Sequence, residues 1–249
     1  MPNHFATIGL PVETPADLSP LARRIVKSSR IFETDRGDYL RWASDSGAEV
    51  WLQADIDKRL NGVHPHFSGK SVVRVGLTRT VVHPEATALD GGFHAWAEPH
   101  NDSPEDGHYP FIFDAPDFLL HQNLTLPCVA MVQIAAFAYE VTVFDSLQAY
   151  NATQTGEMKW AAQSFIPEGL LAHRREPEHS PTALATIRGH ILETELRTNE
   201  LAGLAFYWVL VQTYGAVIDV VIDPQIVNEP IKIGGVIAGS FWLSGRLLS

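Results

Sequence analysis

Hydrophobic and polar positions follow their most regular pattern in the last third of the chain. Apolar runs there are separated by turn residues such as Gly203 and Gly215, which is typical of consecutive strands. The pattern predicts four strands, Ala183–Thr198, Ala205–Tyr214, Ala216–Asp223 and Gly235–Leu247. Glycines such as Gly239 would supply the bends that a closing sheet requires. We therefore expect residues 183–249 to form a small β-barrel.

The beginning of the chain has a different order of elements. Phe5–Val12 is a short apolar run typical of a strand, and Thr14 followed by Pro15 is typical of the start of a helix. Apolar residues then recur at helical spacing as far as Val26, which predicts a helix over residues 14–28. Three short strands are predicted next, at Arg30–Thr34, Tyr39–Ala43 and Glu49–Gln53. The pattern thus predicts a β-α-β-β-β module within residues 1–67.

The middle region, residues 68–166, is predicted to be mostly strand. The expected strands are Ser71–His83, Gly92–Glu98, Phe111–Asp114, Pro127–Ala136 and Phe137–Phe144. Asp145-Ser146 can cap a helix from Leu147 to about Thr153, and Met158–Phe165 fits either a helix or a strand. Residues 167–182 are expected to be a linker or loop. The whole chain is therefore predicted to be an α+β protein that is predominantly β.

Composition and charge narrow the classes of partner. The chain has 249 residues, which is enough to bury a sizeable core, and 45% of them are hydrophobic. A formal net charge of −11 would repel a phosphate backbone, so nucleic acid is not an expected partner. The N-terminal segment lacks the pattern of a signal peptide, and no apolar run reaches the roughly 18 residues that span a bilayer. We expect a cytoplasmic protein without a membrane partner.

The single cysteine, Cys128, lies in the apolar run Leu126–Ala138. One thiol cannot form an internal disulfide, so nothing points to an oxidising compartment. A thiol could act as a nucleophile, but a cysteine within an apolar strand behaves as a small hydrophobic residue. We expect Cys128 to be buried and inert.

The N-terminal order of elements resembles one module of a known superfamily. Together with the segments IGLPVETPADL, DYLRWAS and GAEVWLQ, it resembles the vicinal-oxygen-chelate superfamily of glyoxalases, extradiol dioxygenases and bleomycin-resistance proteins over residues 4–54. Members pair two such modules around a metal, with a His ligand just before an Ile-Gly-Leu-like run and a Glu ligand on the last strand. Thr7 occupies the first of these positions, His4 lies three residues earlier, and Glu49 lies near the second. The sequence contains no second module of this kind.

The C-terminal third carries a second resemblance. The segments TIRGHILETELRTNELAGLAFYWVLVQT and GGVIAGSFWLSGRL resemble the end of an OB-type five-stranded barrel, and the tail of uncharacterised bacterial proteins. In OB-type barrels, aromatic side chains stack on bases. Trp208, Phe241 and Trp242 could do so here, but the acidic charge of the chain favours the interpretation that they pack in the core.

Two groups of residues could ligate a metal. His94, Trp96 and Glu98 alternate on a predicted strand and would share one face, where imidazole and carboxylate could bind a transition metal or act as a base. The same pattern is also typical of an ordinary half-exposed strand. His64-Pro-His66 could place two imidazoles on one metal from an extended chain, although short His pairs also arise by chance.

Two further groups of acidic residues could carry chemistry. The segment Pro99–Tyr109 carries acidic oxygens without the regular spacing of a calcium loop, which favours a solvated loop. Paired carboxylates can act as acid and base, and four acidic residues lie on or beside neighbouring predicted strands near the C-terminus. These are Glu193, Glu195, Asp219 and Asp223. On strands at the rim of a barrel, we expect them to be solvated edge charges.

Two functions remain open from the sequence. The first is a non-enzymatic binding or scaffold protein without a cofactor, which would take a small molecule or a protein in a groove between the N-terminal sheet and the middle strands. The second is a metal-dependent enzyme on a degenerate vicinal-oxygen-chelate-like frame. Its divalent transition metal would be held by His64, His66, His94 and Glu98. Self-association into a homo-oligomer is compatible with either function.

Overall fold

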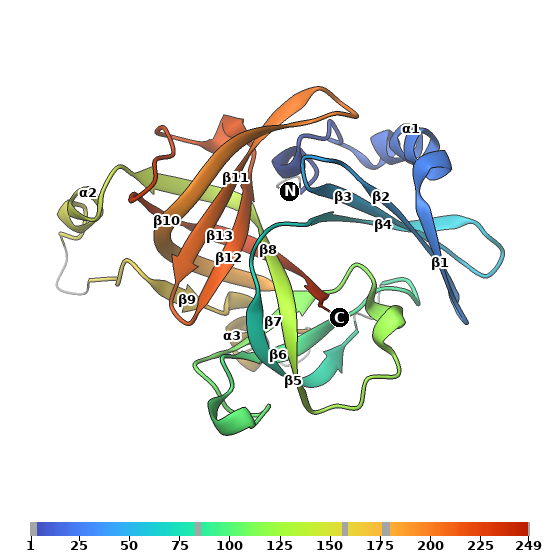
Figure 1. Ribbon diagram of the computed structural model, residues 1–249, viewed down its shortest axis with the longest axis horizontal. Coiled ribbons are helices and arrows are strands. Elements are labelled where there is room, and N and C mark those ends of the chain that lie inside the picture. The colour runs from blue at the N-terminus through green and yellow to red at the C-terminus, as the bar shows by residue number, and fades with distance from the viewer. Residues whose placement is uncertain (1–3, 83–85, 156–158, 176–179, 249) are drawn as a thin grey trace.

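Strands dominate the structure and form two sheets (Figure 1). The computed structural model describes residues 4–82, 86–155, 159–175 and 180–248. Its strands are β1 (Arg30–Thr34), β2 (Gly37–Ala43), β3 (Ala48–Ala54), β4 (Leu60–Phe67), β5 (Val73–Val81), β6 (Gly92–Ala97), β7 (Pro110–Asp114), β8 (Cys128–Phe144), β9 (Ser164–Ile166), β10 (Leu184–Asn199), β11 (Leu204–Thr213), β12 (Ala216–Ile222) and β13 (Val236–Leu247). Its α-helices are α1 (Pro15–Ile25), α2 (Leu147–Ala152) and α3 (Glu168–Arg175). The predicted class, predominantly β within α+β, is confirmed.

Short 3-10 helices occupy some of the connections between these elements. They are Ala6–Ile8, Val26–Ser28, His100–Asp102, Phe118–His121 and Pro224–Ile226. Among the described residues, no helix combines the length and the apolar character needed to cross a bilayer.

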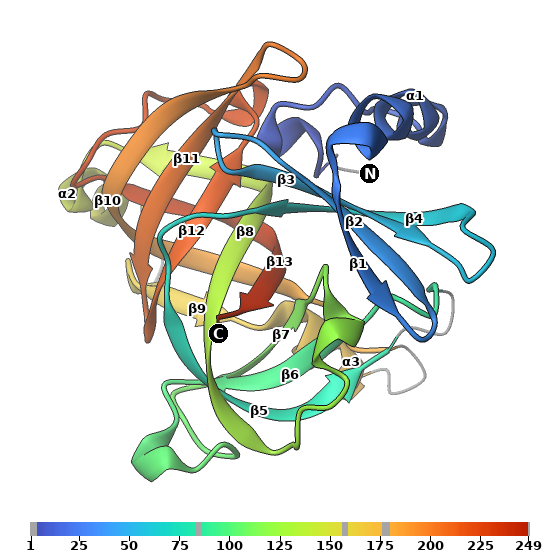
Figure 2. The same cartoon turned by 45° about the vertical axis from the view of Figure 1, so that its right-hand side comes forward.

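The smaller sheet contains β1 to β4 in chain order, and all its neighbouring strands are antiparallel. Helix α1 lies on one side of this sheet, and the larger sheet lies on the other (Figures 1 and 2). The helix begins as its sequence predicts, because Pro15 takes the first helical position and the Asp17 carboxylate accepts the backbone N–H of Thr14 at 2.8 Å. Leu21, Ala22 and Ile25 form its buried side.

The first predicted strand is wrong. Phe5–Val12 contains the 3-10 turn Ala6–Ile8, which ends at Gly9 with a left-handed φ of 71°. Ile8 and Leu10 are nevertheless buried in the core. An apolar run can therefore fill a core without joining a sheet, and hydrophobicity alone does not separate the two cases. The predicted β-α-β-β-β order therefore loses its first strand and gains a fourth strand after the helix, β4, which was not predicted. The observed order is a helix followed by four strands.

The larger sheet contains the remaining nine strands, and its pairings close two rings. In the first ring, β11, β12, β8, β13 and β10 are paired in a closed cycle. In the second ring, β8, β5, β6, β7 and β13 are paired in the same way. Strands β8 and β13 belong to both rings. They pair along almost their whole length, from Val132 opposite Leu247 to Phe144 opposite Val236.

The four predicted C-terminal strands are confirmed to within one residue at each end, as β10 to β13. They do not close a ring by themselves, because β12 pairs with β8 of the middle region. A single cluster of buried hydrophobic side chains also joins the predicted regions, from Ile25 through Phe93 to Phe241. The middle and C-terminal regions therefore share one sheet and one core.

Several predictions for the middle region are confirmed, and one is corrected. The two strands expected between Pro127 and Phe144 are one continuous strand, β8. Helix α2 begins where the sequence indicates, with the Ser146 hydroxyl accepting the backbone N–H of Ala149. The expected linker contains helix α3, whose Leu170 is buried. Parts of three predicted elements, at His83, at Met158 and at 176–179, lie outside the described residues.

Candidate functional site

The two faces of the small sheet differ in chemistry. Side chains alternate between the faces of a strand, and the face toward α1 carries apolar residues such as Trp42, Val50 and Leu52. The opposite face carries Tyr39, Arg41, Glu49, Trp51, Gln53, His64 and His66. Although this second face is polar, it packs against the larger sheet. We call it, together with the residues that it contacts there, the inter-sheet layer.

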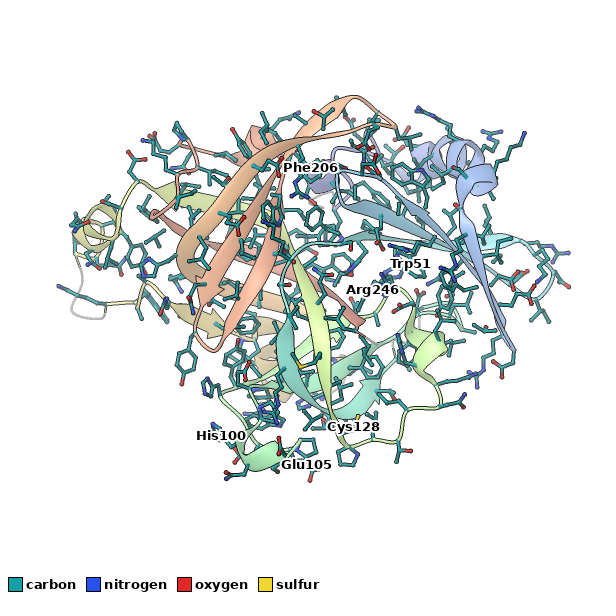
Figure 3. All side chains as sticks on the ribbon, in the orientation of Figure 1. Trp51, His100, Glu105, Cys128, Phe206 and Arg246 are labelled. Atoms are coloured by element: carbon teal, nitrogen blue, oxygen red, sulfur yellow. The ribbon has the colours of Figure 1, made fainter. Side chains whose placement is uncertain are left out.

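Trp51 and four charged residues form the first part of this layer. The guanidinium of Arg41 pairs with the Glu49 carboxylate, which also accepts Trp51 Nε1–H at 2.9 Å. Arg246, on β13, lies over the Trp51 ring at 4.9 Å from its centroid, and it donates from Nε to Asp117 at 3.1 Å (Figure 3). Both carboxylates are buried, and both guanidinium side chains are largely covered.

The charges in this cluster stabilise one another. Burial alone would raise the pKa of Glu49, but the hydrogen bond from Arg41 and the nearby guanidinium charges of Arg246 and Arg41 outweigh burial and lower that pKa. Burial would also raise the pKa of Asp117, but its contacts with His121 and Arg246 lower it by more than burial raises it. The net result is a lowered pKa. Both carboxylates are therefore held as anions and are poor candidates for proton donors at neutral pH.

His66 begins a buried chain of hydrogen bonds that runs into the larger sheet. Gln133 donates its Nε2–H to Asp219 at 2.8 Å, so its Oε1 must accept from His66 Nε2–H at 2.9 Å. The other ring nitrogen, Nδ1, therefore accepts the Ser244 hydroxyl at 2.8 Å. This chain fixes the tautomer of a neutral ring, and burial lowers the pKa of His66 to about 4.

Asp219 is the last residue of this chain of hydrogen bonds, and its position contradicts one prediction. It was expected at a solvated rim, but it is fully buried. Its two oxygens accept four N–H groups, from Lys70 N, Ser71 N, Gln133 Nε2 and Trp208 Nε1, at 2.8–3.0 Å. The covered position of β12 between β11 and β8 explains the burial, and the four donors replace the hydration that is lost.

The other three acidic residues of that group do not join Asp219. Glu193 pairs with Lys70 and Glu195 pairs with Arg197, and both carboxylates are about half exposed. Asp223 accepts the backbone N–H of Gln225 at the start of a 3-10 turn. The expectation of solvated charges thus holds for Glu193 and Glu195.

Aromatic and imidazole rings form the third part of the inter-sheet layer. The His4 ring stacks on Trp242 with centroids 4.3 Å apart, and its Nε2 lies 2.6 Å from the Tyr139 hydroxyl. Trp242 donates Nε1–H to Asp114 at 2.6 Å. Burial, with a contribution from the charge of His64, lowers the pKa of His4 to about 4. Since Trp208 and Trp242 are both buried, the prediction that they pack in the core is confirmed.

The four predicted metal ligands lie in different parts of the structure. His64 and His66 lie on β4, where His64 Nε2 is 2.6 Å from Asp90 Oδ1. His94 lies on β6 of the other sheet, buried and bonded through Nδ1 to Thr78 Oγ1 at 2.7 Å. Glu98 follows the end of β6 with a left-handed φ of 45°, so the alternation that includes His94 stops before it. The part of the chain that the structure describes contains no group of three or more His, Cys, Asp or Glu side chains suited to a metal.

The acidic segment Pro99–Tyr109 is solvated, as expected. The side chains of Asp102 and Asp106 are mostly exposed, and Asp102 pairs with Arg74 at the base of the segment. Figure 3 shows His100 and Glu105 at the periphery, far from Trp51 and Arg246. This loop therefore lies apart from the inter-sheet layer.

Cys128 is less buried than predicted. It is the first residue of β8, follows the cis peptide bond Leu126–Pro127, and is only partly covered. Burial nevertheless raises the pKa of the thiol, which keeps the reactive thiolate scarce at neutral pH. We expect 5,5′-dithiobis(2-nitrobenzoate) to label the native protein at pH 7.5 several times more slowly than the protein in urea. Equal rates would show that the thiol is unprotected.

An open groove lies on the other face of the small sheet, between α1 and the β3–β4 hairpin. Its volume is about 570 Å³. Its lining is mostly apolar with a few polar groups at the edge, namely Pro15, Leu18, Ser19, Ala22, Arg23, Leu52, Leu60, Asn61, Gly62 and Val63. The sequence did not predict this groove, because β4 was missed and four of the ten lining residues belong to it.

Comparison with known proteins adds no identity: no family model, no curated protein and no solved structure matches this chain.

Proposed function

We propose that the protein is a non-enzymatic binding protein that takes a small, largely apolar molecule in the groove between α1 and the β3–β4 hairpin. The observation that carries this proposal is the groove itself. Its volume of about 570 Å³ lies within the range of roughly 300–1,000 Å³ found for ligand pockets, and an apolar lining with a few polar groups is usual for them. Leu60, at its edge, keeps 47% of its surface exposed, so apolar surface is left for a ligand to cover.

The inter-sheet layer favours binding over catalysis as the function. Its side chains are the ones that could act as acid or base, but they are engaged with one another. Glu49 is held by Arg41 and Trp51, and His66 is held between Ser244 and Gln133. A general base needs a free lone pair within reach of a substrate proton. The layer is better explained as the contact that fixes the small sheet on the larger one.

Fluorescence of N-phenyl-1-naphthylamine, a neutral apolar probe, tests the proposal. We expect the native protein to bind this probe, and Leu60→Glu to weaken binding about tenfold, since the ligand then loses roughly 1–2 kcal/mol of apolar contact. Ile56→Glu is the matched control. It places the same charge in the same hairpin, at a side chain that is 72% exposed and does not line the groove.

The control variant should bind the probe as the native protein does, and circular dichroism should show that both variants are folded. Absence of probe binding, or equal weakening by both variants, would contradict the groove as a binding site. Stoichiometric metal, found by elemental analysis of protein purified without added metal, would instead support the metal-dependent enzyme.

A further inference from the structure

The polar residues at the edge of the groove indicate the class of ligand, and this inference rests on the proposed binding function. Among the described residues that line the groove, Arg23 alone carries a charge. The remaining polar side chains are those of Ser19 and Asn61, which are neutral and can donate hydrogen bonds. A ligand in the groove therefore meets a positive edge without a carboxylate, on a chain whose net charge is −11.

Arg23 is free to act on a ligand. It is exposed in the last turn of α1, and it forms no ion pair or hydrogen bond with another residue that the structure describes. The guanidinium of the next residue is already used, since Arg24 donates to the Leu201 carbonyl. A cation near a helix C-terminus interacts favourably with the helix dipole, and this alone could explain a basic residue in the last turn of α1. It does not explain why Arg23 lines an apolar groove.

We propose that the groove takes an amphipathic anion, with its apolar body on Leu18, Leu52 and Leu60 and its anionic group at Arg23. A guanidinium presents a planar set of donors that fits a carboxylate or a similar oxyanion. Ser19 on α1 and Asn61 on β4 also line the groove and can supply further donors. A medium-chain carboxylate such as octanoate has the required combination of chain and charge.

Two fluorescent probes that share their rings and differ by one sulfonate group test this inference. 1-Anilinonaphthalene-8-sulfonate carries the rings of N-phenyl-1-naphthylamine with one added sulfonate. We expect the native protein to bind the sulfonate about three to ten times more tightly than the neutral probe, which is the size of one partly exposed charge-assisted contact. The preference should decrease with added salt, and octanoate should displace the sulfonate better than 1-octanol does.

The Arg23→Gln variant should bring the ratio of the two probe affinities close to one, because it removes the charge that the anionic probe meets in the groove. Lys27→Gln is the matched control, because it removes the same charge from an exposed position beyond α1 that does not line the groove. It should keep the preference, and so should Arg23→Lys to a large extent. All three changes lie at exposed sites, so thermal unfolding should stay near that of the native protein.

The outcomes separate this inference from the proposed function. If the neutral probe binds in the groove but the sulfonate binds no better, the binding function stands and the anionic ligand class is overturned. Equal loss of sulfonate binding in Arg23→Gln and Lys27→Gln would also overturn it, because it would indicate attraction by overall charge. If the neutral probe itself does not bind, the proposed function has failed.

Discussion

Replacing Asp219 with asparagine is expected to lower the free energy of unfolding by roughly 3–6 kcal/mol. Oδ1 accepts from Lys70 N and Trp208 Nε1, and Oδ2 accepts from Ser71 N and Gln133 Nε2. An amide can keep one of these pairs, but its NH₂ group then faces the other two donors. Each buried hydrogen bond to a charged group contributes about 1.5–3 kcal/mol. Since a domain has a total stability of about 5–15 kcal/mol, the variant should be marginally folded.

Urea denaturation followed by tryptophan fluorescence would measure this effect, because Trp208 is itself one of the donors. Asp223→Asn is the matched control. It makes the same chemical change four positions later, at a residue whose carboxylate accepts one backbone N–H in a short turn. We expect that control to change the free energy of unfolding by no more than about 1 kcal/mol. If Asp219→Asn also lay within 1 kcal/mol of the native protein, the buried carboxylate would not be a structural requirement.

Stability is expected to decrease by about 3 kcal/mol between pH 6.5 and pH 4 through His66 alone. Burial holds the pKa of this ring at about 4 in the folded state, against 6.5 ordinarily. Below pH 6.5 the unfolded chain therefore gains a proton that the folded chain does not accept. Stability from this group is fully present above pH 6.5, and it is lost as the pH falls toward 4.

Two other histidines act in the same direction. Burial, assisted by nearby positive charges, also lowers the pKa of His4 and of His94 to about 4. The free energy of unfolding should therefore decrease more steeply with falling pH than the uptake of a single proton would produce. The carboxylates Glu49 and Asp117 have pKa values lowered from 4.5 and 3.8, so below about pH 5 the unfolded chain takes up protons at these groups and their contribution to stability also begins to be lost. The interval from pH 6.5 to about 5 therefore reports on the histidines.

Urea denaturation at a series of pH values would measure how the free energy of unfolding changes with pH. NMR of the imidazole protons would show which histidines are responsible for the change. The His66 ring should remain neutral at pH 5.5 in the folded protein. A His66 resonance that titrates near 6.5, or stability that does not change from pH 6.5 to pH 4, would contradict a neutral buried ring. The measurement uses the unmodified chain and does not depend on a variant that folds.

The elements that were predicted correctly are those with strong local signals. Helix α1 follows from Thr14 and Pro15 at its start and from apolar positions at helical spacing. Strand β4 was missed because Pro65 and two histidines interrupt its apolar pattern. The structure shows why proline is tolerated there: β4 is an edge strand of its sheet, where a missing N–H can be accommodated.

The polar chemistry could be predicted only in part. Glu49, Trp51 and Gln53 alternate along one strand, a pattern that is equally typical of a solvent-exposed face. Their burial depends on the larger sheet, through contacts such as that of Arg246 with Trp51, and no local spacing encodes it. For Asp219 a signal did exist: it lies inside an apolar strand that can be covered on both sides. The other partners of Asp219 are far away in the sequence, and only the folded chain brings them together.

The sharing of β8 and β13 by both rings also bears on how the chain folds. Neither ring can close before residues 236–247 have been synthesised, although most other strands are complete well before then. Contacts between segments so distant in sequence are slow to form, because the entropy of closing the intervening loop must be overcome first. The incomplete chain would meanwhile expose unpaired strand edges, which favour aggregation. The two rings are therefore expected to close only after the last strand of the chain has been synthesised.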